Sequence, residues 1–318
     1  MKIVALDGYL LDPSKELWSI IEPLGEFVLY ERTDSVDTVA RCEGAEIVLT
    51  NKVVMNEEVI TQLPELKFIG VTATGYNVVD TEFARSRGIP VSNVPEYSTR
   101  SVAQHVFAAL LSYIHRPEQH HESVMAGEWT RSKDFAYWLS PIQELAGKTF
   151  GVVGLGKIGR ATAKLAAAFG MKVVASSRRE TNPLDSPGFQ WLSVDELFAQ
   201  SDVISLHCPQ TPETTAMVNQ QLLSKMQSHA ILINTARGGL IVESDLAKAL
   251  NDGQIGGAIL DVVSAEPIVA DNPLLNAKNC IITPHNAWTT IEARKRLVQT
   301  VAQYIVAFQS GSPINLVN

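Results

Sequence analysis

The chain has 318 residues, of which 46% are hydrophobic, and its net charge is −8 at pH 7. This length exceeds what one typical core organises, so we expect two domains. The 26 lysines and arginines are dispersed, which argues against a nucleic-acid surface or a polybasic membrane patch. Apolar runs stay shorter than the 18 residues of a membrane span, and the N-terminus lacks a signal-peptide pattern, so we expect a cytoplasmic protein with no membrane partner.

The three cysteines, Cys42, Cys208 and Cys280, are odd in number and far apart in the sequence. No CxxC pair or Cys/His metal spacing occurs among them. Neither a disulfide framework nor a zinc site is therefore expected.

The first hundred residues alternate short apolar runs with helical patterns, which is typical of an α/β domain with a parallel sheet. The expected strands are residues 2–6, 26–29, 47–50, 68–72 and 90–92. Helices are expected at 56–63 and 79–87, so these elements suffice for a small doubly wound domain. A helix then covers residues 101–111 and is apolar on nearly every side, which indicates burial between domains or against a partner chain.

A second α/β series starts at Thr149. Its expected strands are residues 149–153, 172–175, 203–206, 230–234, 257–260 and 280–282. One helix between them opens with the capping-box pattern Ser193 to Glu196. Six strands with crossover helices is the strand count of a complete dinucleotide-binding domain. The last thirty residues are helical again, from about 290 to 309, and can return to the first domain.

A glycine-rich loop follows the first strand of this second series. Gly154 makes the tight turn, Gly156 lets backbone N–H groups approach a pyrophosphate, and Gly159 lets the next helix pack close to the strand. The start of that helix offers its positive end to the phosphates. The predicted cofactor-binding residues of the loop are Gly154, Gly156, Lys157, Ile158 and Gly159.

The end of the next strand predicts which nicotinamide cofactor is bound. An NAD-binding domain usually has an acid there, which pairs with the ribose 2′-hydroxyl. This chain has Ser177, followed by Arg178 and Arg179. Guanidinium groups match phosphate oxygens, so we expect NADP(H), with NAD(H) as the alternative. The competing interpretation is a solvated basic turn.

Three residues that suit reduction of a 2-oxo acid follow successive late strands: Arg237, Glu266 and His285. Carboxyl ends of strands face the ligand crevice in an open α/β sheet. Arg237 can anchor a carboxylate, His285 can protonate a carbonyl oxygen, and Glu266 can orient the imidazole. Each alone could be structural, whereas their combination after an intact glycine loop favours catalysis.

With these motifs the chain resembles the D-isomer-specific 2-hydroxyacid dehydrogenases, and especially their glycerate dehydrogenase (hydroxypyruvate reductase) branch. The matching stretches are residues 71–80, 154–159, 205–209, 234–239, 260–267 and 283–288. The resemblance implies two doubly wound parallel-sheet α/β domains, with a Rossmann cofactor domain inserted into a flavodoxin-like substrate domain. The implied bounds are 1–100 plus 287–318 for the substrate domain and 101–286 for the NAD(P)-binding domain.

The resemblance also implies roles for individual residues. His285 would be the acid/base paired with Glu266, Arg237 would hold the substrate, and Asp261 would bind the nicotinamide carboxamide. His207, Thr235 and Ala236 would line the cofactor groove, and backbone N–H groups near Thr74 and Gly75 would bind the substrate carboxylate. Trp138 and Trp288 would form walls of the pocket. The alternative for the two tryptophans is ordinary core or interface packing.

The implied reaction is reduction of hydroxypyruvate or glyoxylate, or the reverse oxidation of D-glycerate, in a homodimer formed near residues 101–115. The alternative from another class is a nicotinamide-sensing regulatory binding protein that resembles a dehydrogenase and does not turn over.

Overall fold

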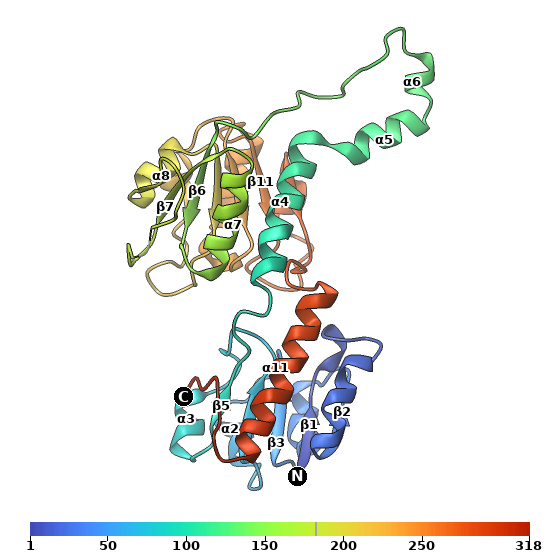
Figure 1. The fold of residues 1–318 in the computed structure, drawn as a ribbon, viewed down its shortest axis with the longest axis vertical. Coiled ribbons are helices and arrows are strands. Elements are labelled where there is room, and N and C mark those ends of the chain that lie inside the picture. The colour runs from blue at the N-terminus through green and yellow to red at the C-terminus, as the bar shows by residue number, and fades with distance from the viewer. Residues whose placement is uncertain (182) are drawn as a thin grey trace. The chain divides into compact units, whose positions relative to one another are not determined.

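The computed structural model describes residues 1–181 and 183–318. The chain divides into two compact units (Figure 1). The first unit consists of Met1–Ser98 and Thr289–Asn318, and the second of Thr99–Trp288. The second unit is therefore inserted into the first. No helix among the described residues is long and apolar enough to cross a membrane.

The first unit is built on a five-stranded parallel sheet of order β2-β1-β3-β4-β5. This is the strand order of a flavodoxin-like doubly wound domain. Its strands are β1 (Lys2–Ala5), β2 (Glu26–Leu29), β3 (Ile47–Thr50), β4 (Phe68–Val71) and β5 (Val91–Ser92). Every residue of β3 and β4 is buried, as expected for central strands covered on both faces.

The helices of the first unit are α1 (Thr38–Arg41), α2 (Glu57–Thr61), α3 (Thr81–Ser86) and α11 (Ile291–Gln309). Helices α2 and α3 begin later than the sequence pattern predicts because each begins after a capping residue. The side chain of Asn56 accepts a hydrogen bond from Val59 N, and that of Asp80 accepts one from Phe83 N. Such caps satisfy N–H groups that the first helical turn leaves unpaired.

The last helix, α11, packs in the first unit. Phe308 of α11 stacks on Phe68 of β4, with ring centroids 4.7 Å apart, and Tyr304 is fully buried beside it. Gly70 permits this approach, because a Cβ there would lie 2.5 Å from the Tyr304 hydroxyl oxygen. The residues that follow α11 form an antiparallel bridge from Leu316 to Ser92 of β5.

The second unit contains a seven-stranded parallel sheet of order β12-β11-β10-β9-β6-β7-β8. The strands are β6 (Thr149–Val153), β7 (Lys172–Ser176), β8 (Gln190–Trp191), β9 (Val203–Leu206), β10 (Ile231–Asn234), β11 (Gly257–Leu260) and β12 (Cys280–Ile282). The strand order reverses between β6 and β9, which is where doubly wound sheets bind ligands. Six strands match the predicted ones, and the two-residue β8 is additional.

The helices of the second unit are α4 (Thr99–His115), α5 (Pro117–Met125), α6 (Glu128–Arg131), α7 (Lys157–Ala168), α8 (Val194–Gln200), α9 (Gln220–Leu223) and α10 (Glu243–Asn251). The predicted capping box is present at α8, between Ser193 and Glu196. Short 3-10 helices occupy Gly8–Leu10, Glu16–Ile20, Glu22–Leu24, Ser35–Asp37, Gly238–Leu240 and Pro273–Asn276.

Helix α4 packs along α7 (Figure 1). Phe107 of α4 stacks on Phe150 of β6 and on Phe169, with centroid distances of 5.8 Å and 5.2 Å. The all-round burial predicted for this helix is not seen in the single chain, because Gln104 and Ala108 are exposed. One strip of α4 therefore faces solvent.

Candidate active site

The glycine-rich loop joins β6 to α7 and depends on close backbone packing. Gly154 has φ +95°, and a Cβ there would lie 2.6 Å from the backbone nitrogen of Cys208. A Cβ at Gly159 would lie 2.2 Å from the Gly154 carbonyl oxygen, whereas a Cβ at Gly156 would meet open space. The first and third glycines therefore let backbones approach each other, and the second leaves the loop open toward a ligand.

Helix α7 begins at this loop without a side-chain cap. Gly156 is the N-cap residue and offers no side-chain acceptor, so no side-chain cap competes with an anion for the positive end of the helix. Nearby, at the end of β10, the buried Thr235 Oγ1 has no hydrogen-bond partner among the described residues. Both features fit the pyrophosphate and polar groups of a dinucleotide.

Basic side chains gather beside the end of β7. Ser177 is half-buried, and Arg178 and Arg179 are exposed. Arg160, one turn into α7, donates to the carbonyl oxygen of Thr181 across 3.0 Å and so lies near the same turn. The charges and the neutral hydroxyl predicted for a 2′-phosphate site are thus present, and Arg160 adds a guanidinium that the sequence pattern alone did not single out.

His207 follows β9 and is held in a neutral form. Its Nε2 lies 2.9 Å from Ser205 Oγ, and burial lowers the pKa of the imidazole to about 4. The ring is therefore uncharged near pH 7. The neighbouring Ala236, after β10, donates its N–H to Asn234 Oδ1 at 3.0 Å. Both residues line the same edge of the sheet as the glycine loop.

Glu266 and His285 form a pair across the loops that follow β11 and β12. His285 Nδ1 and Glu266 Oε2 are 2.7 Å apart, and each side chain is about one third exposed. An imidazole that donates its Nδ1–H to a carboxylate presents Nε2 for proton transfer. The sequence prediction that these two residues meet is thus matched by their geometry.

The loop that carries His285 has an unusual backbone. His285 has φ +51°, the left-handed region that residues other than glycine rarely adopt. Its N–H donates to the carbonyl oxygens of Asp261 and Thr283, both at 2.9 Å. The surrounding structure therefore holds the imidazole in a conformation that the loop would not favour by itself.

The Asp261 carboxylate binds this loop. It accepts hydrogen bonds from Thr283 Oγ1 at 2.6 Å, from Asn286 N at 2.9 Å and from Ala287 N at 3.0 Å. The side chain is 1% exposed. Asp261 thus connects the end of β11 to the segment after β12, and contact with a nicotinamide carboxamide stays a prediction.

Arg237 lies in the turn after β10 and is exposed. Its guanidinium Nη1 donates to the Ala236 carbonyl oxygen at 2.6 Å. The next residue, Gly238, packs against the loop that follows β11, where a Cβ on Gly238 would lie 1.9 Å from the carbonyl carbon of Val263. This backbone contact brings the Arg237 turn beside the loop that carries Glu266.

The remaining predicted substrate contacts are distributed over both units. In the first unit, Thr74 Oγ1 donates to the Val94 carbonyl oxygen at 2.9 Å, and Gly75 follows in the turn after β4. In the second unit, Trp138 is 71% exposed and Trp288 is half-buried. These positions leave the predicted roles of both tryptophans untested.

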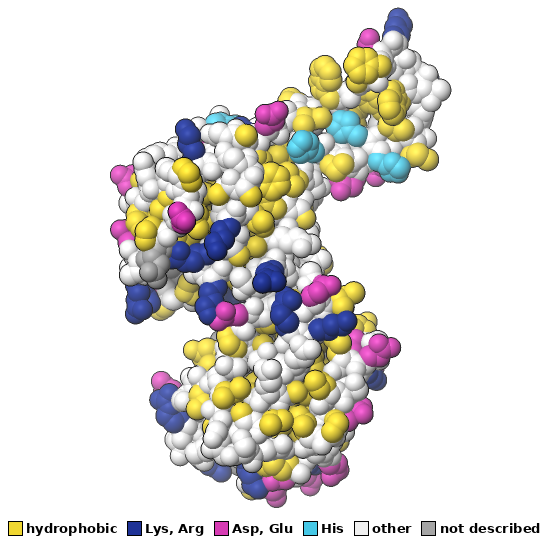
Figure 2. Space-filling model, in the orientation of Figure 1, with side chains coloured by type: hydrophobic (Ala, Val, Ile, Leu, Met, Phe, Trp, Pro, Cys, Tyr) yellow, Lys and Arg dark blue, Asp and Glu magenta, His cyan; other side chains and the backbone are white. Residues whose placement is uncertain are grey.

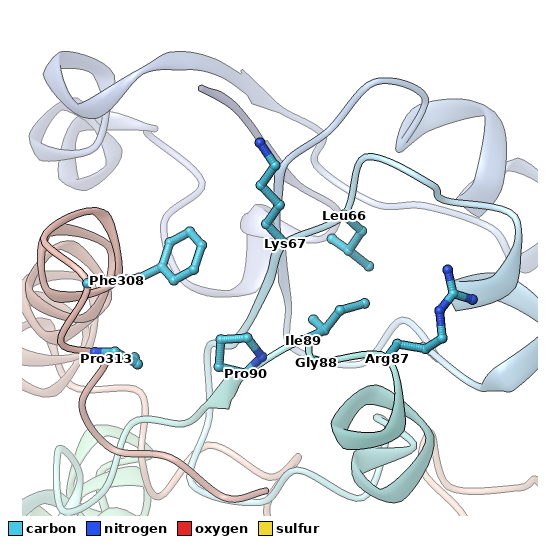
Figure 3. A pocket seen from close by; sticks show the side chains of 9 residues that line it. Leu66, Lys67, Arg87, Gly88, Ile89, Pro90, Phe308 and Pro313 are labelled. Carbon is cyan, nitrogen blue, oxygen red and sulfur yellow. The ribbon is translucent and has the colours of Figure 1, made fainter.

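A surface cavity of about 470 Å³ lies in the first unit, between the amino ends of β4 and β5 and the end of α11 (Figure 3). It is lined by Leu66, Lys67, Arg87, Gly88, Ile89, Pro90, Phe308, Gly311 and Pro313. Lys67 is paired with Glu46 at 2.6 Å, and the lining holds no acid/base pair. The acid/base pair of the candidate active site therefore lies at the strand ends of the second unit and not in this cavity.

Taken together, the glycine loop, the switch point and the Glu266–His285 pair define an oxidoreductase with a nicotinamide dinucleotide domain. The family model described as "D-isomer specific 2-hydroxyacid dehydrogenase, NAD binding domain" matches residues 107–287. The chain belongs to this family of dehydrogenases.

Relatives over the whole chain agree with this assignment. The chain is 48% identical to a hydroxypyruvate reductase of Blautia hydrogenotrophica, covering 100% of both chains. It is 41% identical to a glycerate dehydrogenase of Methylorubrum extorquens, covering 99% of this chain and 98% of the relative. Among solved structures, a D-lactate dehydrogenase from Aquifex aeolicus complexed with NAD and lactic acid has a TM-score of 0.84 at 30% identity, covering 98% and 96%. An acyclic imino acid reductase in complex with NADPH and D-Arg has a TM-score of 0.86 at 31% identity and full coverage of both chains.

Proposed function

We propose that this protein reduces hydroxypyruvate or glyoxylate to D-glycerate or glycolate, and catalyses the reverse oxidation. The observation that carries the proposal is the Glu266–His285 pair beside the carboxyl ends of β11 and β12, in a sheet whose glycine loop is intact. The names of the hydroxypyruvate reductase and glycerate dehydrogenase relatives support the choice of substrate.

The proposed roles follow from the chemistry of each side chain. A nicotinamide cofactor held in the cofactor groove of the second unit would supply the hydride that C2 of the 2-oxo acid receives. His285 Nε2 donates a proton to the carbonyl oxygen, while Glu266 holds Nδ1 and so fixes the direction of the ring. The guanidinium of Arg237 pairs with the substrate carboxylate. One hydride and one proton are thereby added, and the carbonyl becomes a hydroxyl.

The first unit contributes substrate binding in this proposal. The turn at Thr74 and Gly75 lies at the carboxyl end of a parallel sheet, where successive backbone N–H groups can bind a carboxylate. Trp288 is proposed as an apolar wall for the small substrate, and so is Trp138, which in the homodimer proposed below would reach the site of the partner subunit. The second unit contributes the cofactor groove through His207, Thr235, Ala236 and Asp261.

We favour NADP(H) over NAD(H) as the cofactor. Ser177 replaces the acid that would repel a 2′-phosphate, and Arg178 and Arg179 follow it. Arg160 lies close to the same turn through its bond to Thr181. The proposal requires a higher kcat/KM with NADPH than with NADH, and the opposite ranking contradicts it.

We also propose a cytoplasmic homodimer. The segment formed by α5, α6 and residues 132–142 exposes several large apolar side chains, seen as yellow patches beside histidines in Figure 2. These are Met125, Trp129, Phe135, Trp138, Leu139 and Ile142, with Phe135 91% exposed. Apolar surface of this extent is typical of protein interfaces. Sedimentation velocity distinguishes a dimer from a monomer. The proposed cytoplasmic location is supported by the three free cysteines, which suit a reducing compartment.

The direct test is oxidation of NADPH and NADH by the purified protein with a panel of 2-oxo acids. Hydroxypyruvate and glyoxylate should give the highest kcat/KM, ahead of pyruvate and branched 2-oxo acids. Tight cofactor binding without turnover on any member of the panel would instead support a nicotinamide-sensing binding protein.

A further inference from the structure

Helix α4 carries two polar side chains that contact the loop of His285. Ser101 and His105 lie one helical turn apart on an otherwise largely apolar helix. Ser101 Oγ is buried and donates to the Ala287 carbonyl oxygen at 2.5 Å. His105 Nε2 lies 3.2 Å from Thr283 Oγ1, and its side chain is 19% exposed. The two side chains therefore contact both ends of residues 283–287.

The hydrogen-bond directions connect His105 to Asp261 through Thr283. The Thr283 hydroxyl has one proton, which it donates to the Asp261 carboxylate at 2.6 Å. Its oxygen must then accept from His105, so the imidazole carries a proton on Nε2. Asp261 in turn binds the N–H groups of Asn286 and Ala287. A continuous chain of hydrogen bonds thus runs from α4 to both residues that follow His285.

The loop needs this support because His285 has a left-handed backbone at φ +51°. A non-glycine residue keeps such a conformation only where its surroundings over-determine it. The imidazole direction, and hence its 2.7 Å contact with Glu266, depends on that backbone. Support from a second element is also how proteins hold functional groups within a fraction of an ångström.

We propose that Ser101 and His105 are positioning residues for His285, acting through the two ends of its loop. The claim rests on the proposed function, in which His285 transfers the proton. Neither side chain reaches the reacting atoms in this account. A purely structural role for the same pair predicts a loss of stability without a specific effect on the His285 loop.

The kinetic test compares His105→Leu with His105→Gln, whose amide can donate from the position of Nε2. His105→Leu should lower kcat with hydroxypyruvate by about fivefold or more, because one hydrogen bond is lost, while the KM for the nicotinamide cofactor stays within about twofold. His105→Gln should restore most of kcat. His115→Leu, at the exposed end of the same helix, is the matched control and should resemble the wild type.

A double mutant identifies the route. If His105 acts through Thr283, the variant with both His105→Leu and Thr283→Val should be no slower than Thr283→Val alone. Independent, multiplying losses would overturn the proposal. Equal kcat for His105→Leu and the wild type, or equal loss in the Leu and Gln variants, would also overturn it.

Hydrogen exchange provides a readout that does not need turnover. His105→Leu and Ser101→Ala should each speed exchange of the amides of His285, Asn286 and Ala287, while amides of β6 keep wild-type rates. Unchanged exchange in that loop overturns the positioning role even if the enzyme is active. An inactive wild type overturns the proposed function, and the exchange result then decides the present claim separately. Ser101→Ala, a smaller change, serves if His105→Leu does not fold.

Discussion

Replacing Asp261 with Asn tests whether its carboxylate holds the His285 loop. The carboxylate accepts three hydrogen bonds, from Thr283 Oγ1, Asn286 N and Ala287 N. A carboxamide of the same shape keeps one acceptor oxygen and points an NH₂ group at the other position. In either orientation, at least one N–H or O–H donor of the loop then faces another donor inside a site that is 1% exposed.

The expected loss of stability follows from those contacts. A hydrogen bond to a charged group contributes about 1.5–3 kcal/mol, and leaving a buried donor unpaired adds a penalty of about 1–3 kcal/mol. Some relaxation of the loop offsets part of this, so we expect Asp261→Asn to lower the free energy of unfolding by about 2–4 kcal/mol. For a domain of this size, that corresponds to a Tm about 5–15 °C lower.

Thermal and urea unfolding, followed by circular dichroism on the protein without added cofactor, measure this effect. Asp252→Asn is the control, because Asp252 is an exposed residue that pairs with Lys248 on the surface, and it should unfold close to the wild type. A change below about 0.5 kcal/mol for Asp261→Asn, or one equal to the control, would refute the view that the carboxylate holds the loop.

Three further predictions address the cofactor site. Gly159→Ala should lower the free energy of unfolding by about 1–3 kcal/mol and weaken cofactor binding, because its Cβ would lie 2.2 Å from the Gly154 carbonyl oxygen. Gly156→Ala has open space around its Cβ and should weaken cofactor binding only. Thermal unfolding measures the first effect and fluorescence titration the second. Ser177→Asp should lower the ratio of kcat/KM with NADPH to that with NADH by at least about tenfold, and an unchanged ratio would remove Ser177 from the specificity argument. Burial lowers the pKa of His207 to about 4, so the unfolded chain binds a proton at this position before the folded chain does as the pH falls below about 6.5. The free energy of unfolding should therefore fall toward pH 4 by up to about 1.4 kcal/mol per pH unit. Unfolding of His207→Asn should depend less on pH, and identical pH profiles would contradict the burial of this ring.

Much of the fold could be read from the sequence because parallel strands are short, continuous apolar runs. The predicted strands at 26–29, 47–50, 149–153 and 203–206 have the observed bounds. The glycine loop was also readable, since Gly154 and Gly159 are required by backbone contacts that no larger side chain permits. Local pattern and tertiary packing agree at these positions.

Other features depend on contacts that the local pattern does not contain. Strand β8 has only two residues, too few to show any periodicity, and it exists because it pairs with β7. The start of α3 is set by the Asp80 cap, so the predicted start at residue 79 was too early. Helix α4 is apolar on nearly every side, and only its packing in the fold decides that the apolar Ala108 faces solvent in the single chain.

The support of the active-site loop was missed for the same reason. Ser101 and His105 are separated by four residues in an apolar helix, and this spacing was the available signal. The partner of His105, Thr283, is 178 residues away in the sequence, and the partner of Ser101, Ala287, is 186 residues away. Only the folded chain brings these groups together.

The claim that His285, held by Glu266, transfers the proton is tested most directly by His285→Asn. The measurement is kcat/KM for hydroxypyruvate with saturating reduced cofactor, alongside the cofactor Kd from fluorescence titration. The account predicts a loss of about 100-fold or more in kcat/KM with a Kd within about threefold of the wild type, because general acid catalysis typically contributes 10²–10⁴-fold in rate. A loss smaller than about tenfold, in a variant that still binds the cofactor, would contradict it.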